Sequence, residues 1–329
     1  MYCLNNKQPL KLEEITFAEL GMKESDIEEI LRKNIDMVCD DEESLLVVGQ
    51  QVKNEKLGRS DLTAIDDSGN LVLIEIKRDR KDIEGRKEAF EFQAIRYAAS
   101  CATIKTPDEL IQNVFAPYVE KHKAEFGKEE LTSVEIAKRK LTDFVNNNEI
   151  VDFNVHQRIV LIASDFDEQT LSAVAWLNSN QVDISCYRIC PYKMGESVIV
   201  DVKRILPVME YKDFYVDVVK KDTIIKEKKR DITRQVLPKI DKMLEWGMVQ
   251  AGDVLVAKGT TEEATLQEDG QVATANGIMT LQQWLKGIYG WSSVQTYAFV
   301  IQKSSGKLLM DLRSEYMERE MNTEVEEET

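Results

Sequence analysis

Asp61, Glu75 and Lys77 lie on either side of a turn-forming cluster, residues 67–69, in segments that are otherwise rich in apolar and β-branched residues. If the turn is centred on Ser68, antiparallel pairing places Asp61 opposite Glu75, and directly opposed Cβ atoms lie about 5 Å apart. Residues two apart on a strand share a face, so Lys77 joins them. The sequence therefore predicts that two carboxylates and one amine meet at one point.

Two carboxylates at one point repel each other unless a proton or a cation lies between them. A hard divalent cation resolves this, because Mg²⁺ prefers oxygen ligands and is commonly held by one or two carboxylates together with phosphate oxygens of the substrate. Bound Mg²⁺ or Mn²⁺ would lower the pKa of a water molecule and stabilise the charge that develops at phosphorus. Lys77 would orient or deprotonate that water and neutralise the transition state. The chemistry predicted from these residues is metal-dependent hydrolysis of a phosphodiester.

A bare Glu-x-Lys on a strand is more often an exposed ion pair, with an aspartate such as Asp61 capping a nearby turn. Three features favour the site instead. The strand is otherwise apolar, and the register brings Asp61 opposite Glu75. A following helix, residues 84–102, carries Gln93 and Tyr97 at i, i+4 spacing on one face, so both can point to the same place.

Three short motifs together resemble those of the PD-(D/E)XK restriction-endonuclease-like nucleases, with nucleases of the NucS type as the nearest relatives. The motifs are Gly58–Asp61, Glu75–Lys77 and Gln93–Tyr97. The resemblance covers residues 20–102 by motif and extends to about residue 207 by its strand pattern. The family's usual proline before the first aspartate is Ser60 in this chain.

The resemblance implies a role for each motif residue. Asp61, Glu75 and the Ile76 carbonyl would bind the metal, Lys77 would assist the water, and Gln93 would support the site, with Tyr97 beside it. It also implies an acidic residue on the first helix, which the apolar pattern predicts to run to about residue 34. Glu24 fits best as that acid, and Glu28, one turn later, is the alternative.

The strand and helix signals predict an α/β fold, a mixed sheet flanked by helices, in a first domain over residues 1–207. Predicted strands cover residues 45–52, 58–66, 70–78, 158–164, 182–189 and 197–206. A helix is expected over residues 167–180, and a helical insertion of unassigned role over about residues 105–148.

The C-terminal part has a different sequence pattern, in which short β-like runs alternate with glycine-containing turns. Residues 239–313 resemble a RAMA domain, a module associated with restriction enzymes and adenine methylases, and are expected to form a small α+β domain that recognises DNA. The Gly290–Trp291 pair carries most of this resemblance. Trp291 could stack on a base or serve as a core aromatic. A linker helix is expected over residues 208–238 and an acidic tail over residues 314–329.

The net charge of −16 opposes DNA binding, because Lys and Arg supply most of the affinity for phosphates. Residues 77–87 are locally basic, however, and Arg59 is a candidate DNA contact. The five cysteines are odd in number and scattered, which indicates reduced thiols, and the spacing of Cys186 and Cys190 does not favour a zinc site. No apolar run suits a signal peptide or a membrane span, so a cytoplasmic location is expected.

The leading hypothesis is a Mg²⁺-dependent DNA endonuclease of restriction, defence or repair, whose C-terminal domain selects the substrate. The alternative is a nuclease-fold protein that no longer cuts and acts as a DNA reader or regulatory binding protein. The second domain could also bind a protein. A homodimer is a general expectation for soluble proteins.

Overall fold

The apolar strands predicted in the first half of the chain form the middle of a large sheet in the computed structural model. The structure describes residues 1–5, 8–39, 41–54, 58–84, 88–127, 130–208 and 237–317. Within these residues a mixed sheet of seven strands has the order β3-β8-β7-β6-β5-β4, with β9 paired to β8. The strands are β3 (Glu13–Glu14), β4 (Leu45–Asn54), β5 (Gly58–Asp66), β6 (Leu71–Lys77), β7 (Gln157–Ala163), β8 (Ile184–Met194) and β9 (Ser197–Leu206).

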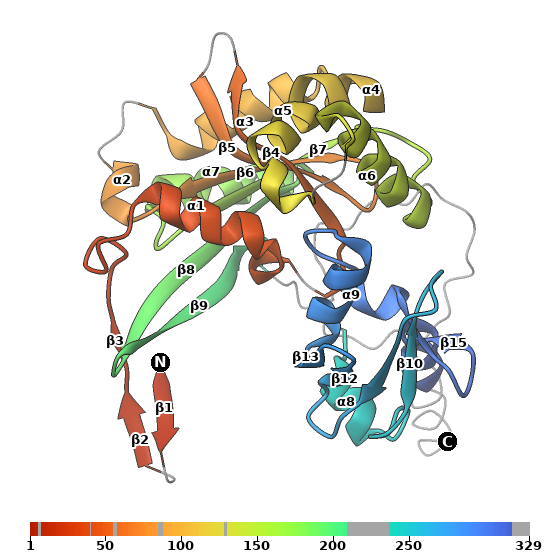
Figure 1. The fold of residues 1–329 in the computed structure, drawn as a ribbon. Coiled ribbons are helices and arrows are strands. Elements are labelled where there is room, and N and C mark those ends of the chain that lie inside the picture. Colours follow the sequence, from red (N-terminus) through yellow and green to blue (C-terminus); the bar gives the residue numbers. More distant parts are fainter. Residues whose placement is uncertain are drawn as a thin grey trace, which may run out of the picture. The chain divides into compact units, whose positions relative to one another are not determined.

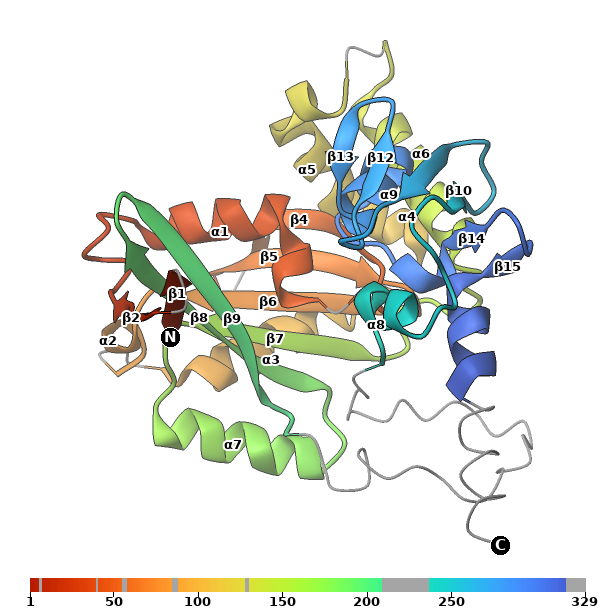
Figure 2. The ribbon, with the colours of Figure 1, turned by 90° about the horizontal axis from the view of Figure 1, so that it is seen from below.

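Strand β6 is central, because it pairs antiparallel with β5 on one side and parallel with β7 on the other. All its residues are buried. Parallel neighbours require crossover connections, which place helices on the faces of the sheet. Figure 2 shows α1 on one face and α3 and α7 on the other. These helices are α1 (Glu24–Lys33), α3 (Phe90–Cys101) and α7 (Glu168–Ser179).

The turn between β5 and β6 has the predicted centre. The paired residues run from Leu62 opposite Ile74 to Ile65 opposite Leu71, a register that is symmetric about Ser68. Gly69 adopts a φ of 80°. A Cβ atom there would lie 2.4 Å from the Asp152 carbonyl oxygen, so the turn requires glycine at this position.

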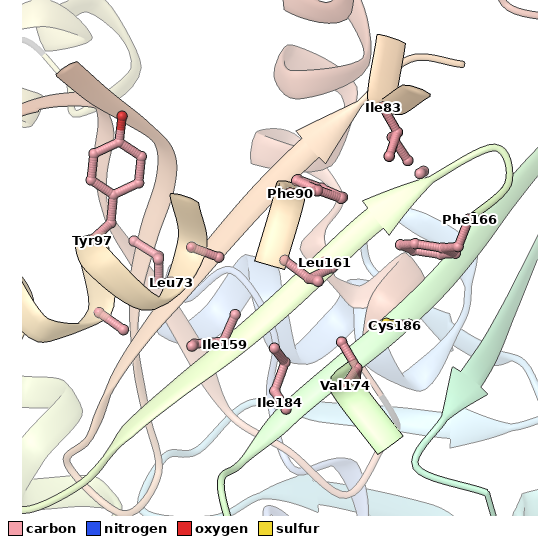
Figure 3. Close-up of a cluster of buried hydrophobic side chains, with 13 residues drawn as sticks. Leu73, Ile83, Phe90, Tyr97, Ile159, Leu161, Phe166, Val174, Ile184 and Cys186 are labelled. Atoms are coloured by element: carbon pink, nitrogen blue, oxygen red, sulfur yellow. The ribbon is translucent and has the colours of Figure 1, made fainter. Parts of the chain in front are cut away.

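The core between α3, α7 and the sheet is apolar (Figure 3). Phe90 at the start of α3 is fully buried, and its ring stacks on Phe166 with the ring centroids 6.3 Å apart. The sequence predicts one helix over residues 84–102. In the structure a short helix, α2 (Arg80–Glu84), precedes α3 and ends where the prediction begins.

The expected insertion is helical and packs against strand β4. Its helical segment Ile111–Phe115 contributes Val114, whose Cγ1 would lie 2.9 Å from a Cβ atom at Gly49. A side chain at Gly49 would therefore separate the insertion from the sheet. The insertion comprises α4 (Pro107–Leu110), η2 (Ile111–Phe115), α5 (Ala116–Lys121), η3 (Lys123–Glu125) and α6 (Ser133–Asn147).

The chain forms two compact units, and their division differs from a simple cut near residue 207. The first comprises Met1–Val38 and Leu45–Val208, and the second comprises Cys39–Ser44 and Met209–Thr329. The segment Cys39–Ser44 belongs to the second unit because buried Arg313 bonds Glu42 at 2.6 Å and the Thr296 amide bonds the Asp41 carbonyl at 2.7 Å. Residues 209–236, most of the expected linker helix, lie outside the described residues.

The second unit contains a separate antiparallel sheet in the order β13-β12-β11-β10-β14-β15. Figure 1 labels its strands β10, β12, β13 and β15. Its described elements are α8 (Ile240–Glu245), β10 (Val254–Ala257), β11 (Glu263–Leu266), β12 (Val272–Thr274), β13 (Gly277–Met279), α9 (Leu281–Tyr289), η5 (Thr296–Ala298), β14 (Val300–Gln302) and β15 (Lys307–Leu308). Residues 309–317 are helical, and Tyr316 stacks on Trp246. The expected acidic tail therefore begins inside an ordered helix.

Three smaller features complete the fold. An N-terminal hairpin of β1 (Tyr2–Asn5) and β2 (Gln8–Lys11), which the sequence pattern does not predict, precedes β3, and the 3₁₀ turn η1 (Ile35–Val38) follows α1. None of the five cysteines forms a disulfide in the described structure. Among the described helices, none combines the length and hydropathy needed to cross a membrane.

Candidate active site

The carboxyl end of β6 buries two charged side chains. Glu75 is 0% exposed and Lys77 is 1% exposed. Lysine is almost never fully buried unless it is paired, because the cost of removing an ammonium from water must be offset by nearby negative charge. The end of the central strand therefore marks a place where opposite charges gather.

Asp61 lies near the carboxyl end of β6, at the point where the pairing of β5 with β6 ends. The pairing ends at Leu62 opposite Ile74, and continuation would place Asp61 opposite Glu75, as predicted. In an antiparallel ladder every second pair of opposed residues is hydrogen-bonded, and one such pair here is Asp66 with Asn70. If the ladder continued beyond Leu62 and Ile74, the Ile76 amide would bond the backbone of β5. Instead, the Ile76 amide donates to Asp61 Oδ2 at 2.8 Å.

The Lys77 ammonium lies among three oxygen atoms from three residues. Its Nζ is 2.5 Å from the Ile76 carbonyl oxygen, 3.2 Å from Glu24 Oε1 and 4.0 Å from Asp61 Oδ2. It also lies 5.4 Å from the centroid of the Phe90 ring. The structure thus brings together Asp61, Lys77 and the predicted acid of the first helix.

Glu75 meets the predicted partner on α3. Gln93 Nε2 donates to Glu75 Oε2 at 3.3 Å. Tyr97, one turn later, is 5% exposed. Burial raises the pKa of the Tyr97 phenol, and its hydrogen bond with Gln93 partly opposes the shift. Glu75, Gln93 and Tyr97 therefore occupy one neighbourhood, and the phenol stays protonated at neutral pH.

The alternative first-helix acid, Glu28, also contacts the site, through a residue that the sequence reasoning missed. Gln51 Nε2 donates to Glu28 Oε2 at 2.6 Å and to Asp61 Oδ1 at 3.2 Å. Glu24 reaches the cluster through Lys77, whereas Glu28 reaches it through Gln51. The available signal was the pair of glutamines, Gln50 and Gln51, which interrupts the apolar run of β4.

Burial dominates the electrostatics of these acids. It raises the pKa of Asp61, against the lowering effects of Lys77 and of the Ile76 amide. Burial likewise raises the pKa of Glu28, opposed by the Gln51 hydrogen bond and reinforced by the negative charge of Asp61. The site therefore holds buried carboxylates with fewer positive charges than would stabilise their ionised forms.

The donor atoms fit a hard cation that needs few protein ligands. Carboxylate and carbonyl oxygens of Asp61, Glu75 and Ile76 are the donors that Mg²⁺ and Mn²⁺ prefer. The Ile76 carbonyl already accepts from an ammonium, so its lone pairs point toward a positive charge. Among the described residues, no three His, Cys, Asp or Glu side chains form a metal-binding group. Mg²⁺ keeps several waters and is commonly bound through one or two carboxylates, so it does not need such a group.

The two candidate DNA contacts have different surroundings. Arg59 is exposed on β5, two residues before Asp61. Trp291 in the second unit is 5% exposed; its ring stacks on Tyr289 and meets Phe299 edge-on, with centroids 4.8 and 5.2 Å away. Trp284 of α9 is equally buried. These tryptophans are core aromatics in the described structure, and neither presents an open face to a base.

The comparisons with known proteins add no relative to this picture. No protein-family model matches the chain, and no curated protein matches it. The residues of the site are therefore the basis for inferring the function.

Proposed function

We propose that the chain is a metal-dependent DNA endonuclease of the PD-(D/E)XK kind, with its active site at the carboxyl end of β6. The observation that carries the proposal is that buried Lys77 lies between buried Asp61 and the partly exposed Glu24, on the same strand as fully buried Glu75. Burying these charges destabilises a fold, so their grouping at the end of a central strand favours a catalytic role.

Asp61, Glu75 and the Ile76 carbonyl would hold Mg²⁺ or Mn²⁺. When bound, the metal would lower the pKa of an attacking water and stabilise the charge developing at phosphorus. Gln93 orients the Glu75 carboxylate through its amide, and the Ile76 amide orients Asp61. These hydrogen bonds leave the oxygens fixed before any substrate arrives, which reduces the reorganisation needed during reaction.

Lys77 supplies the positive charge of the protein itself. Its ammonium, paired with Glu24, would donate a hydrogen bond to the attacking water or to a phosphate oxygen. Hydrolysis forms a bond between the water oxygen and phosphorus and breaks the bond from phosphorus to one sugar oxygen. The water loses one proton to a base, and the departing oxygen gains one.

The ribbon formed by β4 and β5 offers a place for the phosphates that flank the scissile one. Lys53 and Arg59 are exposed and directly opposite each other, and Arg59 lies two residues from Asp61 on the same strand. Directly opposed like charges repel, and a phosphate between them removes the repulsion. A local basic pair of this kind would offset the unfavourable net charge of −16.

We infer that the second unit, which resembles a RAMA domain, selects the DNA that the site cuts, in a restriction, defence or repair setting. Its tryptophans support the small fold from within, so recognition would fall to its exposed polar residues. This assignment rests on the sequence resemblance of residues 239–313.

The test is a cleavage assay on supercoiled, linear, single-stranded and base-modified DNA with Mg²⁺ or Mn²⁺. The variants are Asp61→Asn, Lys77→Met and Glu91→Gln. Glu91 is the matched control, because it is a carboxylate on α3 that is 4% exposed and hydrogen-bonds Thr170 at 3.1 Å, outside the cluster.

We expect wild type and Glu91→Gln to cleave alike, and Asp61→Asn and Lys77→Met to lose about 10²–10³-fold or more, as when a group that stabilises transition-state charge is removed. Equal cleavage by all four proteins would reject the site. If wild type binds DNA but cleaves none of these substrates, the reader hypothesis replaces the nuclease.

A further inference from the structure

Gln51 has a backbone conformation that an ordinary strand residue avoids. Its φ is 53°, in the left-handed region that residues other than glycine and asparagine rarely adopt. The neighbouring pairs are Gln50 with Leu62 and Val52 with Ser60, so Gln51 lies directly opposite Asp61. Non-glycine residues in this region persist only where the surrounding structure imposes it, and they gather at functional sites.

The Gln51 amide fixes two acids that come from different elements. Its single NH₂ group donates to Glu28 Oε2 of α1 at 2.6 Å and to Asp61 Oδ1 of β5 at 3.2 Å. The Ile76 amide holds the other oxygen, Asp61 Oδ2, at 2.8 Å. Both oxygens of Asp61 therefore have donors, which sets the rotation of the carboxylate.

The helical insertion holds β4 in the conformation that this bridge requires. The strand has an irregular register between Val47 and Gly49, where η2 packs closely against it. One residue before the bridge, Gln50 Oε1 contacts Lys121 Nζ and His122 Nε2, each at 2.8 Å. The residues just before Gln51 are thus held by contacts from the insertion, which gives that segment a role.

We propose that Gln51 is a positioning residue of the site, which locks the Asp61 carboxylate for metal binding and joins it to Glu28. This inference rests on the proposed function. It assigns the acids of α1 to different tasks, with Glu28 supporting Asp61 and Glu24 supporting Lys77. Without the amide, Asp61 can rotate and the two carboxylates move apart.

A purely structural role for Gln51 makes a different prediction. In that case its replacement changes the melting temperature and leaves metal affinity alone. The chain offers a matched control for the backbone strain, since Gln181 also has a positive φ, of 64°, and is exposed after α7. The amide of the next residue, Val182, donates to the Leu177 carbonyl at 3.0 Å. Helices that end with this hydrogen bond usually have glycine at the position that Gln181 occupies.

The experiment measures Mn²⁺ binding to the full chain without DNA, by titration calorimetry, together with the melting temperature and cleavage of plasmid DNA. The variants are Gln51→Gly, which relieves the strain and removes the amide, and Gln181→Gly, which relieves the strain alone. Gln51→Asn keeps a residue suited to positive φ with a shorter side chain and serves if Gln51→Gly does not fold.

We expect Gln181→Gly to melt higher than wild type and to bind Mn²⁺ equally. Gln51→Gly and Gln51→Asn should bind Mn²⁺ about 10–100-fold more weakly, the usual effect of losing a residue that orients a metal ligand. Cleavage should fall through kcat, while KM for DNA stays unchanged.

Unchanged Mn²⁺ affinity in a folded Gln51 variant would overturn the proposal for Gln51. Wild type that binds Mn²⁺ but cuts no DNA would reject the nuclease function alone, because the affinity difference between wild type and Gln51→Gly would still report on positioning. Wild type that binds no Mn²⁺ would overturn both.

Discussion

Glu28 and Glu29 are neighbours on α1 and lie in opposite electrostatic surroundings. Burial raises the pKa of Glu28, which faces Gln51 and Asp61. Hydrogen bonds from Arg32 lower the pKa of Glu29 to about 2. On one face of α1 the surroundings destabilise the ionised form of Glu28, and on the adjacent face they stabilise the ionised form of Glu29.

The difference separates a structural ion pair from a candidate active site. Arg32 is 5% exposed and contacts Glu29 at 2.7 Å, Glu125 at 2.7 Å and the Tyr118 hydroxyl at 2.9 Å. Its charge is matched locally, and the cluster ties α1 to the insertion. Among the described residues, Glu28 has no comparable positive charge beside it. A fold keeps a destabilising buried carboxylate of this kind when selection acts on something besides stability.

Removing the Arg32 guanidinium should give the largest effect on stability. Arg32→Met removes the guanidinium from Glu29 and Glu125 and leaves Glu29 its contact with Lys33 at 3.0 Å. Breaking a buried pair costs about 3–5 kcal/mol. Both acids are partly solvated, so we expect about 2–3 kcal/mol, or roughly 5–10 °C in the melting temperature. Calorimetric or fluorescence-detected melting measures this. A melting temperature within 1–2 °C of wild type would mean that the cluster is not structural.

Glu28→Gln and Glu29→Gln should separate the two faces by activity. Glu28 shares the Gln51 donor with Asp61, so Glu28→Gln should lower cleavage and Mn²⁺ affinity by about 10–100-fold. Glu29→Gln should cut at the wild-type rate. The measurement is initial cleavage rates at saturating Mn²⁺ together with titration calorimetry. Similar losses in both variants would show that α1 acts through its stability alone.

The register of β5 and β6 could be predicted because it depends on a local turn and an alternating pattern. The predicted register about Ser68 is the one that the structure has. Helical spacing predicted that Gln93 and Tyr97 share a face of α3, where Gln93 bonds Glu75. Gln51 could not be foreseen, because its role arises from a positive φ and a strand irregularity imposed by the distant insertion. The place of Cys39–Ser44 in the second unit depends on Arg313, which lies far along the sequence. Long-range packing of this kind leaves no periodic signal.

Glu28→Gln should also raise the stability of the metal-free protein at neutral pH. The folded pKa of Glu28 lies above its ordinary value of 4.5, so the folded state binds the proton more tightly than the unfolded chain does. The contribution of Glu28 to stability is thus greatest below pH 4.5 and is lost as the pH rises through the folded pKa. We expect a gain of about 2–4 °C for the variant near pH 7, the shift that about 1 kcal/mol produces in a unit of this size.

The control for this prediction is pH. The gain should shrink as the pH is lowered, because a larger fraction of wild-type Glu28 is then protonated and resembles glutamine. Melting curves of both proteins in chelator across this range provide the measurement. A gain that stays constant with pH would trace to packing and would remove the charge argument for Glu28.

Glu29→Gln should give the smallest change and the opposite sign. The pKa of Glu29 is lowered from 4.5 to about 2, so its ion pair with Arg32 stabilises the folded state above pH 4.5 and is lost as the pH falls toward 2. The Glu29 side chain is 39% exposed, so the loss at pH 7 should stay below about 1 kcal/mol. On acidification the melting temperature of Glu29→Gln should approach that of wild type from below, whereas the melting temperature of Glu28→Gln should approach it from above. Melting curves that shift in the same direction for both variants would contradict the contrast between the two faces of α1.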